Sequence, residues 1–405
     1  AGAWCGQNKY LSAIKNAFQN FMPLTIAGAI GVLWCNVLVN DQTGLGLFFK
    51  PIMALDFLNP AFQAVNFCTI SCITVGITLG IAQEIGVWNM GAEKAGYIPG
   101  LVGLAAWLSV TNTSHMVEGA KEAFTGIAGN ELGATGLFTG MIIGVLSVEL
   151  FCFFEKQDAL KIKMPEQVPP GVARAFEVLV PATITLIITA CIGSACYNLT
   201  GLYLNDVIKN GIQGPLGAVG ATIPGVMIIY LVIMLFWLVG IHGNNMLSAV
   251  KEALFTPLAL ENVEKFNKGE KPTNIINMYA LQMWGEFGGS GVTIGLVIAI
   301  MIFGKREDNK AIASLSLVPG LFNINETVTF GVPMVLNPIL GIPFVVAPLI
   351  TIIIGYVLTV IGFCPVACLT VPWTTPPIVF GFLACGANVM GAVTQAILIV
   401  VSTVI

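Results

Sequence analysis

The chain has 405 residues, of which 56% are hydrophobic and only 9% are charged. Soluble domains carry about 25% charged residues, so this composition excludes an ordinary soluble protein and predicts a chain embedded in a membrane. The formal net charge of -4 gives no basic surface for nucleic acid, and we expect no nucleic-acid partner.

The long apolar stretches of the chain predict helices that cross the membrane. A spanning helix needs about 20 mostly apolar residues. Nine stretches approach or reach this length: residues 22–39, 65–81, 98–110, 135–154, 175–197, 216–239, 290–303, 344–363 and 387–404. Together with one re-entrant or tenth helix, they predict an all-α integral membrane protein with about ten transmembrane helices and re-entrant hairpins.

Three segments between these stretches are less regular, namely residues 242–289, 317–343 and 364–386. Each is broken by Gly and Pro, and interrupted segments of this kind are the best sequence pointer to the binding site of a transporter. The C-terminal half is therefore where we expect the substrate.

The distribution of basic residues predicts the orientation. Lys and Arg gather before the first stretch and in residues 156–174, whereas residues 40–60 contain only Lys50. Because cytoplasmic loops are enriched in Lys and Arg, we expect a cytoplasmic N-terminus. Two further basic clusters flank residues 273–304, so this segment either enters and returns as a hairpin or crosses once.

The most informative segment is residues 317–331, which places Glu326 among two Asn and two Thr residues inside an apolar region. A carboxylate at membrane depth costs several kcal/mol, so it usually faces a cavity, a partner or a substrate. The segment therefore favours a polar ligand site, and the alternative is a polar cluster that packs helices together.

Other polar clusters follow the same pattern. His242 lies between two Gly residues at the end of an apolar stretch, and Glu286 lies in a Gly-rich segment beside Trp284. Trp373 and Thr374 lie among prolines that prevent a regular helix. Aromatic faces with amide and carboxylate groups are typical of a sugar site; structural packing is the alternative for His242, and a membrane-interface position for Trp373.

The sequence contains no motif for ATP hydrolysis or for a cysteine metal site. There is no GxxxxGK[ST] segment for ATP, and the ten Cys residues show no repeated CxxC pair. We therefore expect neither a metal nor a cofactor.

Three motifs carry a resemblance to a known family: Gly-Ile-His-Gly-Asn-Asn at 240–245, Phe-Asn-Ile-Asn-Glu at 322–326 and Val-Pro-Trp-Thr-Thr-Pro at 371–376. Together they resemble the enzyme IIC component of a sugar phosphotransferase system, in its lactose/cellobiose/diacetylchitobiose branch. The resemblance extends over nearly the whole chain.

The resemblance implies a multi-pass permease of the bacterial plasma membrane, surrounded by lipid, that forms a homodimer. It would import a β-linked disaccharide of the cellobiose or diacetylchitobiose class and present it to a separate IIB protein, which a IIA protein phosphorylates. The chain would act as a phosphotransferase only together with IIB. On this basis residues 1–210 form an N-terminal scaffold and dimerisation bundle, and residues 211–405 form the part that binds and transports the substrate.

The resemblance also assigns roles. His242 and Glu326 would contact the sugar hydroxyl that receives the phosphoryl group, with Glu326 as general base. The residues expected to bind the sugar are Trp237, Asn244, Asn245, Glu286, Asn325, Trp373 and Thr374.

Two other functions remain open at this point. An ion-coupled secondary sugar transporter would use the buried Glu and His residues as a proton relay. A glycan flippase would need larger apolar grooves. Neither would depend on a IIB protein.

Overall fold

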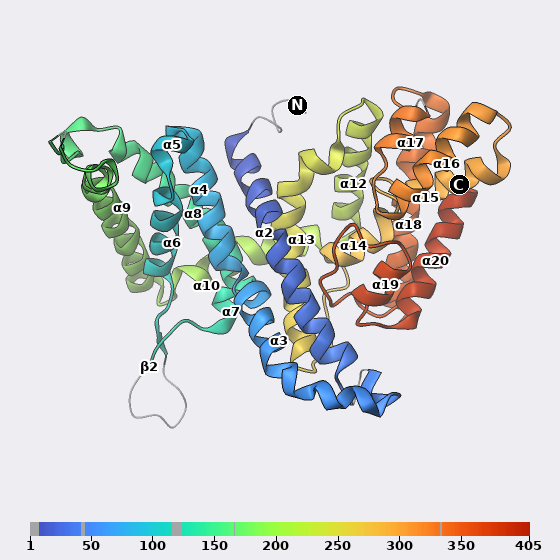
Figure 1. The fold of residues 1–405 in the computed structure, drawn as a ribbon, viewed down its shortest axis with the longest axis horizontal. Coiled ribbons are helices and arrows are strands. Elements are labelled where there is room, and N and C mark those ends of the chain that lie inside the picture. Colours follow the sequence, from blue (N-terminus) through green and yellow to red (C-terminus); the bar gives the residue numbers. More distant parts are fainter. Residues whose placement is uncertain (1–7, 42–44, 116–123, 166, 333) are drawn as a thin grey trace. The chain divides into compact units, whose positions relative to one another are not determined.

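The computed structural model describes residues 8–41, 45–115, 124–165, 167–332 and 334–405. Residues 42–44, in the predicted outer loop 40–60, lie outside these ranges. The structure is helical (Figure 1), and the only strands in the described part of the chain are β1 (Ser114–His115) and β2 (Phe124–Thr125), which pair antiparallel.

Two compact units divide the chain. The first contains Thr25–Cys68 and Leu216–Ile405, and the second contains Gln7–Leu24 and Thr69–Pro215. The helix α2 (Lys9–Leu33) contributes to both units, because its first part belongs to the second unit and its remainder to the first.

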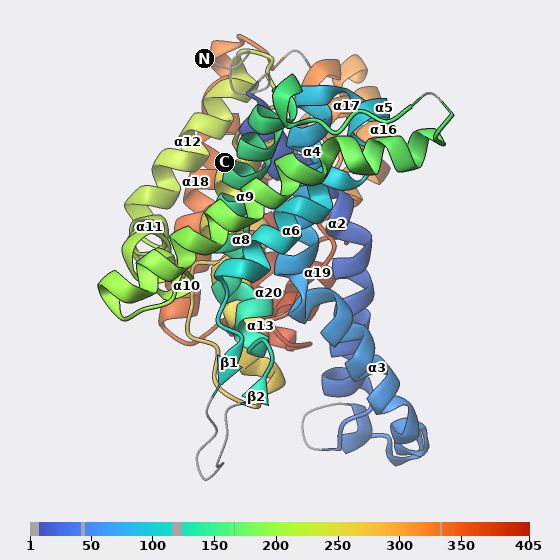
Figure 2. The ribbon, with the colours of Figure 1, turned by 90° about the vertical axis from the view of Figure 1, so that its left-hand side faces the viewer.

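The second unit is built around α4 (Ile73–Met90), α6 (Ile98–Val110) and α8 (Ala134–Glu155). Small residues let these helices approach closely, as is usual in membranes. A Cβ atom added at Gly103 would lie 2.3 Å from the Cβ of Ala82, and one at Gly140 would lie 2.2 Å from Oγ1 of Thr78. The helix α9 (Pro170–Thr200) packs across α6 and α8, as Figure 2 shows. The remaining helices of the unit are short: α5 (Ala92–Ala95), α7 (Gly129–Leu132) and α10 (Leu204–Ile208).

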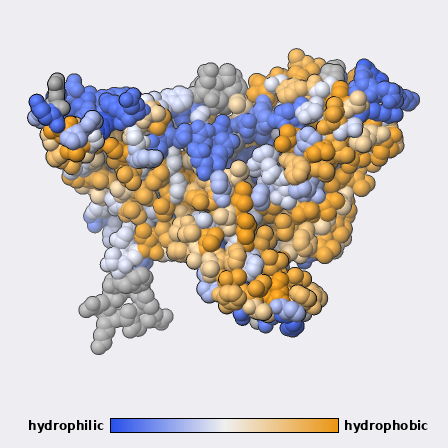
Figure 3. Space-filling view, viewed as in Figure 1, coloured by the Kyte–Doolittle hydropathy of each residue, from blue (hydrophilic) through white to orange (hydrophobic). Residues whose placement is uncertain are grey.

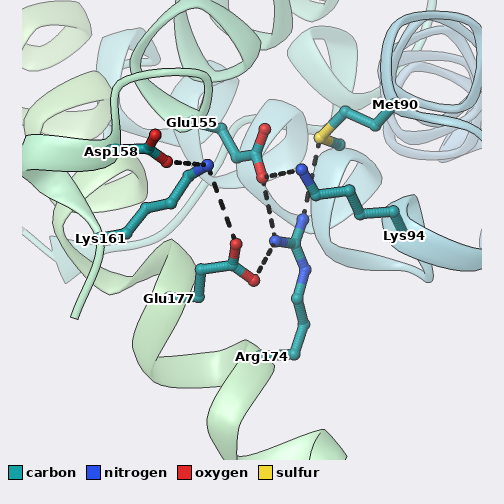
Figure 4. Close-up of polar contacts among 7 residues, drawn as sticks. All are labelled: Met90, Lys94, Glu155, Asp158, Lys161, Arg174 and Glu177. Atoms are coloured by element: carbon teal, nitrogen blue, oxygen red, sulfur yellow. Dashed lines mark hydrogen bonds and ion pairs between the residues drawn. The ribbon is translucent and has the colours of Figure 1, made fainter. Parts of the chain in front are cut away.

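Charged residues form a network between the end of α8 and the start of α9 (Figure 4). The buried carboxylate of Glu155 accepts from Lys94 at 2.9 Å and from Arg174 at 3.0 Å, and Arg174 also reaches Glu177 at 2.7 Å. In the loop between α8 and α9, the hydrogen bond from Lys161 lowers the pKa of the Asp158 carboxyl below its ordinary value. These contacts join α5, α8 and α9.

The first unit contains the predicted broken segments as short helices and turns. Its helices are α3 (Asn59–Asn66), α11 (Gly214–Gly220), α12 (Ile223–Leu238), α13 (Gly243–Asn267), α14 (Met278–Gly285), α15 (Thr293–Phe303), α16 (Glu307–Leu321), α17 (Glu326–Gly331), α18 (Pro338–Val360), α19 (Val379–Ala384) and α20 (Val389–Val404). Asn side chains accept from the free N–H groups at the starts of α14, α18 and α20: Asn277, Asn337 and Asn388. Figure 3 shows hydrophobic residues over much of the face seen, with hydrophilic residues along its upper edge.

Each of the nine predicted apolar stretches contains a helix, although the ends differ. The start of α2 lies at Lys9 rather than at residue 22, while α6 has the predicted bounds of 98 and 110. The expected break within residues 242–289 is wrong for its first part, because α13 runs continuously from Gly243 to Asn267 through Pro257. Helices in membrane proteins tolerate Pro where neighbouring groups satisfy the freed backbone.

Among the described residues, four helices are long and apolar enough to cross a membrane, or up to six if each bent helix pair forms one span. Three shorter apolar helices, α6, α15 and α20, add to these. Together with the turns between α14 and α15 and between α16 and α17, they make an all-helical membrane protein with re-entrant elements.

Candidate functional site

His242 lies at the break between α12 and α13, where the chain reverses. Gly240 has φ +81°, a conformation that favours glycine, and lets the backbone turn after α12. His242 then caps α13: its Nδ1 accepts the backbone N–H of Asn245 at 3.2 Å. Because Nδ1 accepts a hydrogen bond, the neutral ring carries its proton on Nε2.

Glu326 is the first residue of α17 and faces that proton. Its Oε1 lies 3.6 Å from Nε2 of His242, which is too long for a direct hydrogen bond. The side chains of His242 and Glu326 are 35% and 47% exposed, so a ligand can reach both. A hydroxyl group placed between them could donate to the carboxylate and accept from the imidazole.

Trp237 supports this pair from the end of α12. Its ring centroid lies 4.4 Å from that of His242, and the residue is only 1% exposed. The indole packs among residues of α12, α15, α16, α17 and α18 in a common hydrophobic core. The structure therefore places Trp237 behind His242; a direct contact with sugar stays a prediction.

The amides of Asn244 and Asn325 hold one turn from two sides. Nδ2 of Asn244 donates to Oγ of Ser290 at 3.0 Å, and Nδ2 of Asn325 donates to the Ser290 carbonyl at 2.8 Å. Oδ1 of Asn244 is buried and has no hydrogen-bond partner in the described part of the chain. Asn244 as a whole is half-buried, whereas the neighbouring Asn245 is exposed.

Asn323, which the sequence analysis did not select, connects three loops. Its Nδ2 donates to the carbonyls of Trp373 and, at 3.1 Å, Thr375, while its Oδ1 accepts the Gly288 N–H at 2.7 Å. Asn323 has φ +62°, which Asn tolerates better than most residues. The first Asn of the Asn-Ile-Asn motif, two residues before the selected Asn325, was the available signal for this role.

Trp373 and Thr374 lie in the loop that Asn323 holds. Trp373 is 44% exposed and Thr374 is also exposed. Asn323 holds the backbone of this loop, so the indole ring of Trp373 remains free to stack on a ligand.

Glu286 does not face the site as an unpaired carboxylate. It lies at the end of α14, and its Oε1 accepts from Tyr230 of α12 at 2.6 Å and from Nζ of Lys251 of α13. Neither Lys251 nor Tyr230 was among the site residues expected from the sequence. Lys251 is a buried Lys within α13, and a Lys in the interior of this helix was the feature that could have indicated it from the sequence.

Hydrogen bonds, the ring contact of Trp237 with His242 and the approach of His242 to Glu326 bring most of the sequence-predicted residues into one region of the first unit. Within the described ranges, no three His, Cys, Asp or Glu residues form a group that could hold a metal ion. The region offers a hydroxyl position between an N–H donor and a carboxylate, together with an exposed indole.

Comparisons with known proteins show the family to which the chain is similar. Residues 15–348 match the family described as "Phosphotransferase system, EIIC". The oligo-beta-mannoside-specific EIIC component of Bacillus subtilis is 33% identical over 98% of this chain and 88% of its own length. The cellobiose-specific EIIC component of Lactococcus lactis is 30% identical over 99% of this chain and 93% of its own length.

A solved structure has the same fold. The transporter ChbC, the IIC component from the N,N'-diacetylchitobiose-specific phosphotransferase system, matches with a TM-score of 0.90 and 29% identity. The match covers 99% of this chain and 93% of that one.

Proposed function

This chain belongs to the EIIC family of the sugar phosphotransferase systems, and we propose that it imports a β-linked disaccharide of the cellobiose or diacetylchitobiose class and presents it for phosphorylation by a IIB partner. The relatives' printed specificities, oligo-β-mannoside, cellobiose and diacetylchitobiose, support this substrate class. The observation that carries the chemistry is the 3.6 Å separation of His242 and Glu326.

In the proposed reaction the acceptor hydroxyl lies between these two side chains. The hydroxyl oxygen accepts from Nε2–H of His242 and donates its proton to the Glu326 carboxylate, which acts as general base. The oxygen then attacks the phosphorus carried by the IIB protein, and the bond between phosphorus and the carrier breaks. Phosphoryl transfer depends mainly on positioning and charge stabilisation, so residues that fix these two side chains contribute to the rate.

The remaining predicted residues complete the substrate site. Trp373 would stack on the apolar face of a sugar ring, with Thr374 beside it. Asn244 would contact the sugar from its half-buried position, and Asn245 from its exposed position.

The proposal includes an orientation and an assembly. A cytoplasmic N-terminus places the loop between α8 and α9 on the side of the IIB protein, as the concentration of Lys and Arg in that loop favours. The chain would form a homodimer in the bacterial plasma membrane, with IIA acting through IIB.

Uptake measurements test the proposal. Cells that express the chain with cognate IIA and IIB proteins should accumulate labelled cellobiose or diacetylchitobiose as sugar phosphate. Omission of IIB should abolish the phosphorylated product. Accumulation of free sugar that continues without IIB and collapses when the ion gradient is removed would contradict the proposal.

A further inference from the structure

A buried ionic network lies within the first unit, beside the proposed reacting groups. The side chain of Lys251 is 7% exposed and that of Glu286 is 13% exposed, and the two form an ion pair. The Tyr230 hydroxyl donates to the same carboxylate oxygen, Oε1 of Glu286, at 2.6 Å, and Nζ of Lys251 lies 5.5 Å from the centroid of the Tyr230 ring. The network thereby joins α12, α13 and the end of α14.

Stability alone does not account for such a pair. Removing two charges from water costs several kcal/mol per ion, and replacing a buried ion pair by well-packed neutral residues is often neutral or stabilising. What an ion pair supplies is a fixed geometry, because the partners must meet at a defined distance. The ion pair with Lys251 therefore fixes the position of the Glu286 side chain.

Glu286 begins the turn that separates α14 from α15. The turn contains three glycines with positive φ, Gly288 at +79°, Gly289 at +102° and Gly291 at +87°, so its own backbone is permissive. Gly289 N–H donates to the Glu286 carbonyl at 3.2 Å. Such a turn needs external contacts to hold one conformation.

The turn 286–291 contacts residues that are close in sequence to His242 and Glu326. Ser290 accepts from Asn244, two residues after His242, and from Asn325, the residue before Glu326. A Cβ atom at Gly289 would lie 2.6 Å from the Cβ of Asn325, so the turn packs directly against that residue. A displacement of the turn would change the separation of His242 and Glu326.

We infer that Lys251 and Tyr230, acting through Glu286, are positioning residues for phosphoryl transfer: they fix the turn 286–291 and thereby the distance between His242 and Glu326. Glu286 is then a structural anchor and not a ligand of the sugar. The inference rests on the proposed function, and it replaces the sugar-binding role that the sequence predicted for Glu286.

The double variant Lys251→Met with Glu286→Gln tests this inference. It removes both charges, keeps similar side-chain lengths and leaves an amide oxygen for Tyr230. We expect sugar dissociation constants within about twofold of wild type and a single-turnover rate of transfer from phosphorylated IIB lower by on the order of 10- to 100-fold, the scale on which small misplacements act. Calorimetry with cellobiose and diacetylchitobiose and a quenched time course give the two quantities.

A matched control is available on the same helix. Lys268 and Glu264 form an exposed ion pair at 2.6 Å in α13. The double variant Lys268→Met with Glu264→Gln should change neither quantity.

Two results would overturn the inference. A wild-type transfer rate in the Lys251/Glu286 variant would show that the pair does not position the site, and a large loss of sugar affinity would show that Glu286 binds sugar. If the double variant does not fold, Tyr230→Phe applies the same test, because it removes one hydrogen bond to Glu286 and keeps the ion pair. Absence of sugar phosphate with the wild-type chain would instead contradict the proposed function itself.

Discussion

Nε2 of His242 and Oε1 of Glu326 face each other across 3.6 Å, although they belong to different helices. His242 caps α13 through Nδ1, which leaves its Nε2 proton directed at the carboxylate. The cap thus fixes which ring nitrogen faces the reaction, and this determines the division of roles between the two residues.

The first prediction concerns the general base. Glu326→Gln keeps the shape of the side chain but removes the proton acceptor, so the rate of sugar phosphate formation should fall by roughly 10²-fold or more. Sugar binding should change much less. Formation of sugar phosphate at the wild-type rate, measured with saturating phosphorylated IIB, would refute the general-base role.

The second prediction concerns Trp373. Its exposed ring should stack on the sugar, and aromatic contacts contribute about 0.5–1.5 kcal/mol beyond area burial. Trp373→Ala should therefore raise the sugar dissociation constant by roughly twofold to tenfold. Trp88, an exposed Trp of the second unit, offers a control, since Trp88→Ala should leave sugar binding unchanged. If calorimetry gives the same sugar dissociation constant for wild type and Trp373→Ala, Trp373 does not bind sugar and a membrane-interface position explains it.

The third prediction concerns Asn323. Asn323→Asp keeps the acceptor for the Gly288 N–H but loses both donations, to the carbonyls of Trp373 and Thr375. Each lost hydrogen bond costs about 0.5–1.5 kcal/mol, so the variant should bind sugar more weakly and melt at a lower temperature. Thermal unfolding followed with and without sugar measures both effects. An unchanged sugar-induced shift would show that the loop is held by other contacts.

The fourth prediction concerns Glu155, which is 1% exposed and bonded to Lys94 and Arg174. Glu155→Gln leaves Arg174 with a single carboxylate partner, Glu177, among the ion pairs of the described residues. Breaking a buried ion pair costs up to about 3–5 kcal/mol, and less here because Lys94 is 45% exposed. The melting temperature in detergent should drop clearly. Asp158→Asn, at a carboxylate 81% exposed, is the control and should have almost no effect.

The fifth prediction concerns orientation. A cysteine at the exposed position Gln157 should resist an impermeant thiol reagent in intact cells and react in inverted vesicles, and a cysteine at the exposed position Asp41 should behave in the opposite way. The accessible native cysteines are first replaced. Labelling of position 157 from outside would reverse the topology and the direction of transport.

The sequence by itself determined the features that depend only on neighbouring residues, namely the apolar helices and the breaks between them. Apolar stretches of sufficient length form helices wherever they occur, so all nine were found, and the bounds of α6 were predicted to the residue. The Gly and Pro residues of segments 317–343 and 364–386 predicted that neither segment forms one regular helix, because these residues limit backbone conformation at their own positions. His242 and Glu326 were selected as candidates for the same kind of reason, since an ionisable group in an apolar segment is visible in the sequence alone, and their role stays a prediction.

Only the tertiary structure decided which polar groups have partners. Hydropathy placed the start of the first span at residue 22, but α2 begins at Lys9, after Asn8, whose side chain accepts from the N–H groups of Tyr10 and Leu11. The polar residues of its first turns find partners on other helices: Lys9 pairs with Glu149, and Asn16 donates to Glu84. A hydropathy window cannot see partners that come from other helices. The same limit applies to Glu286: its neutralisation by Lys251 follows from how α13 packs against α14, and this packing is a property of the folded chain rather than of either segment.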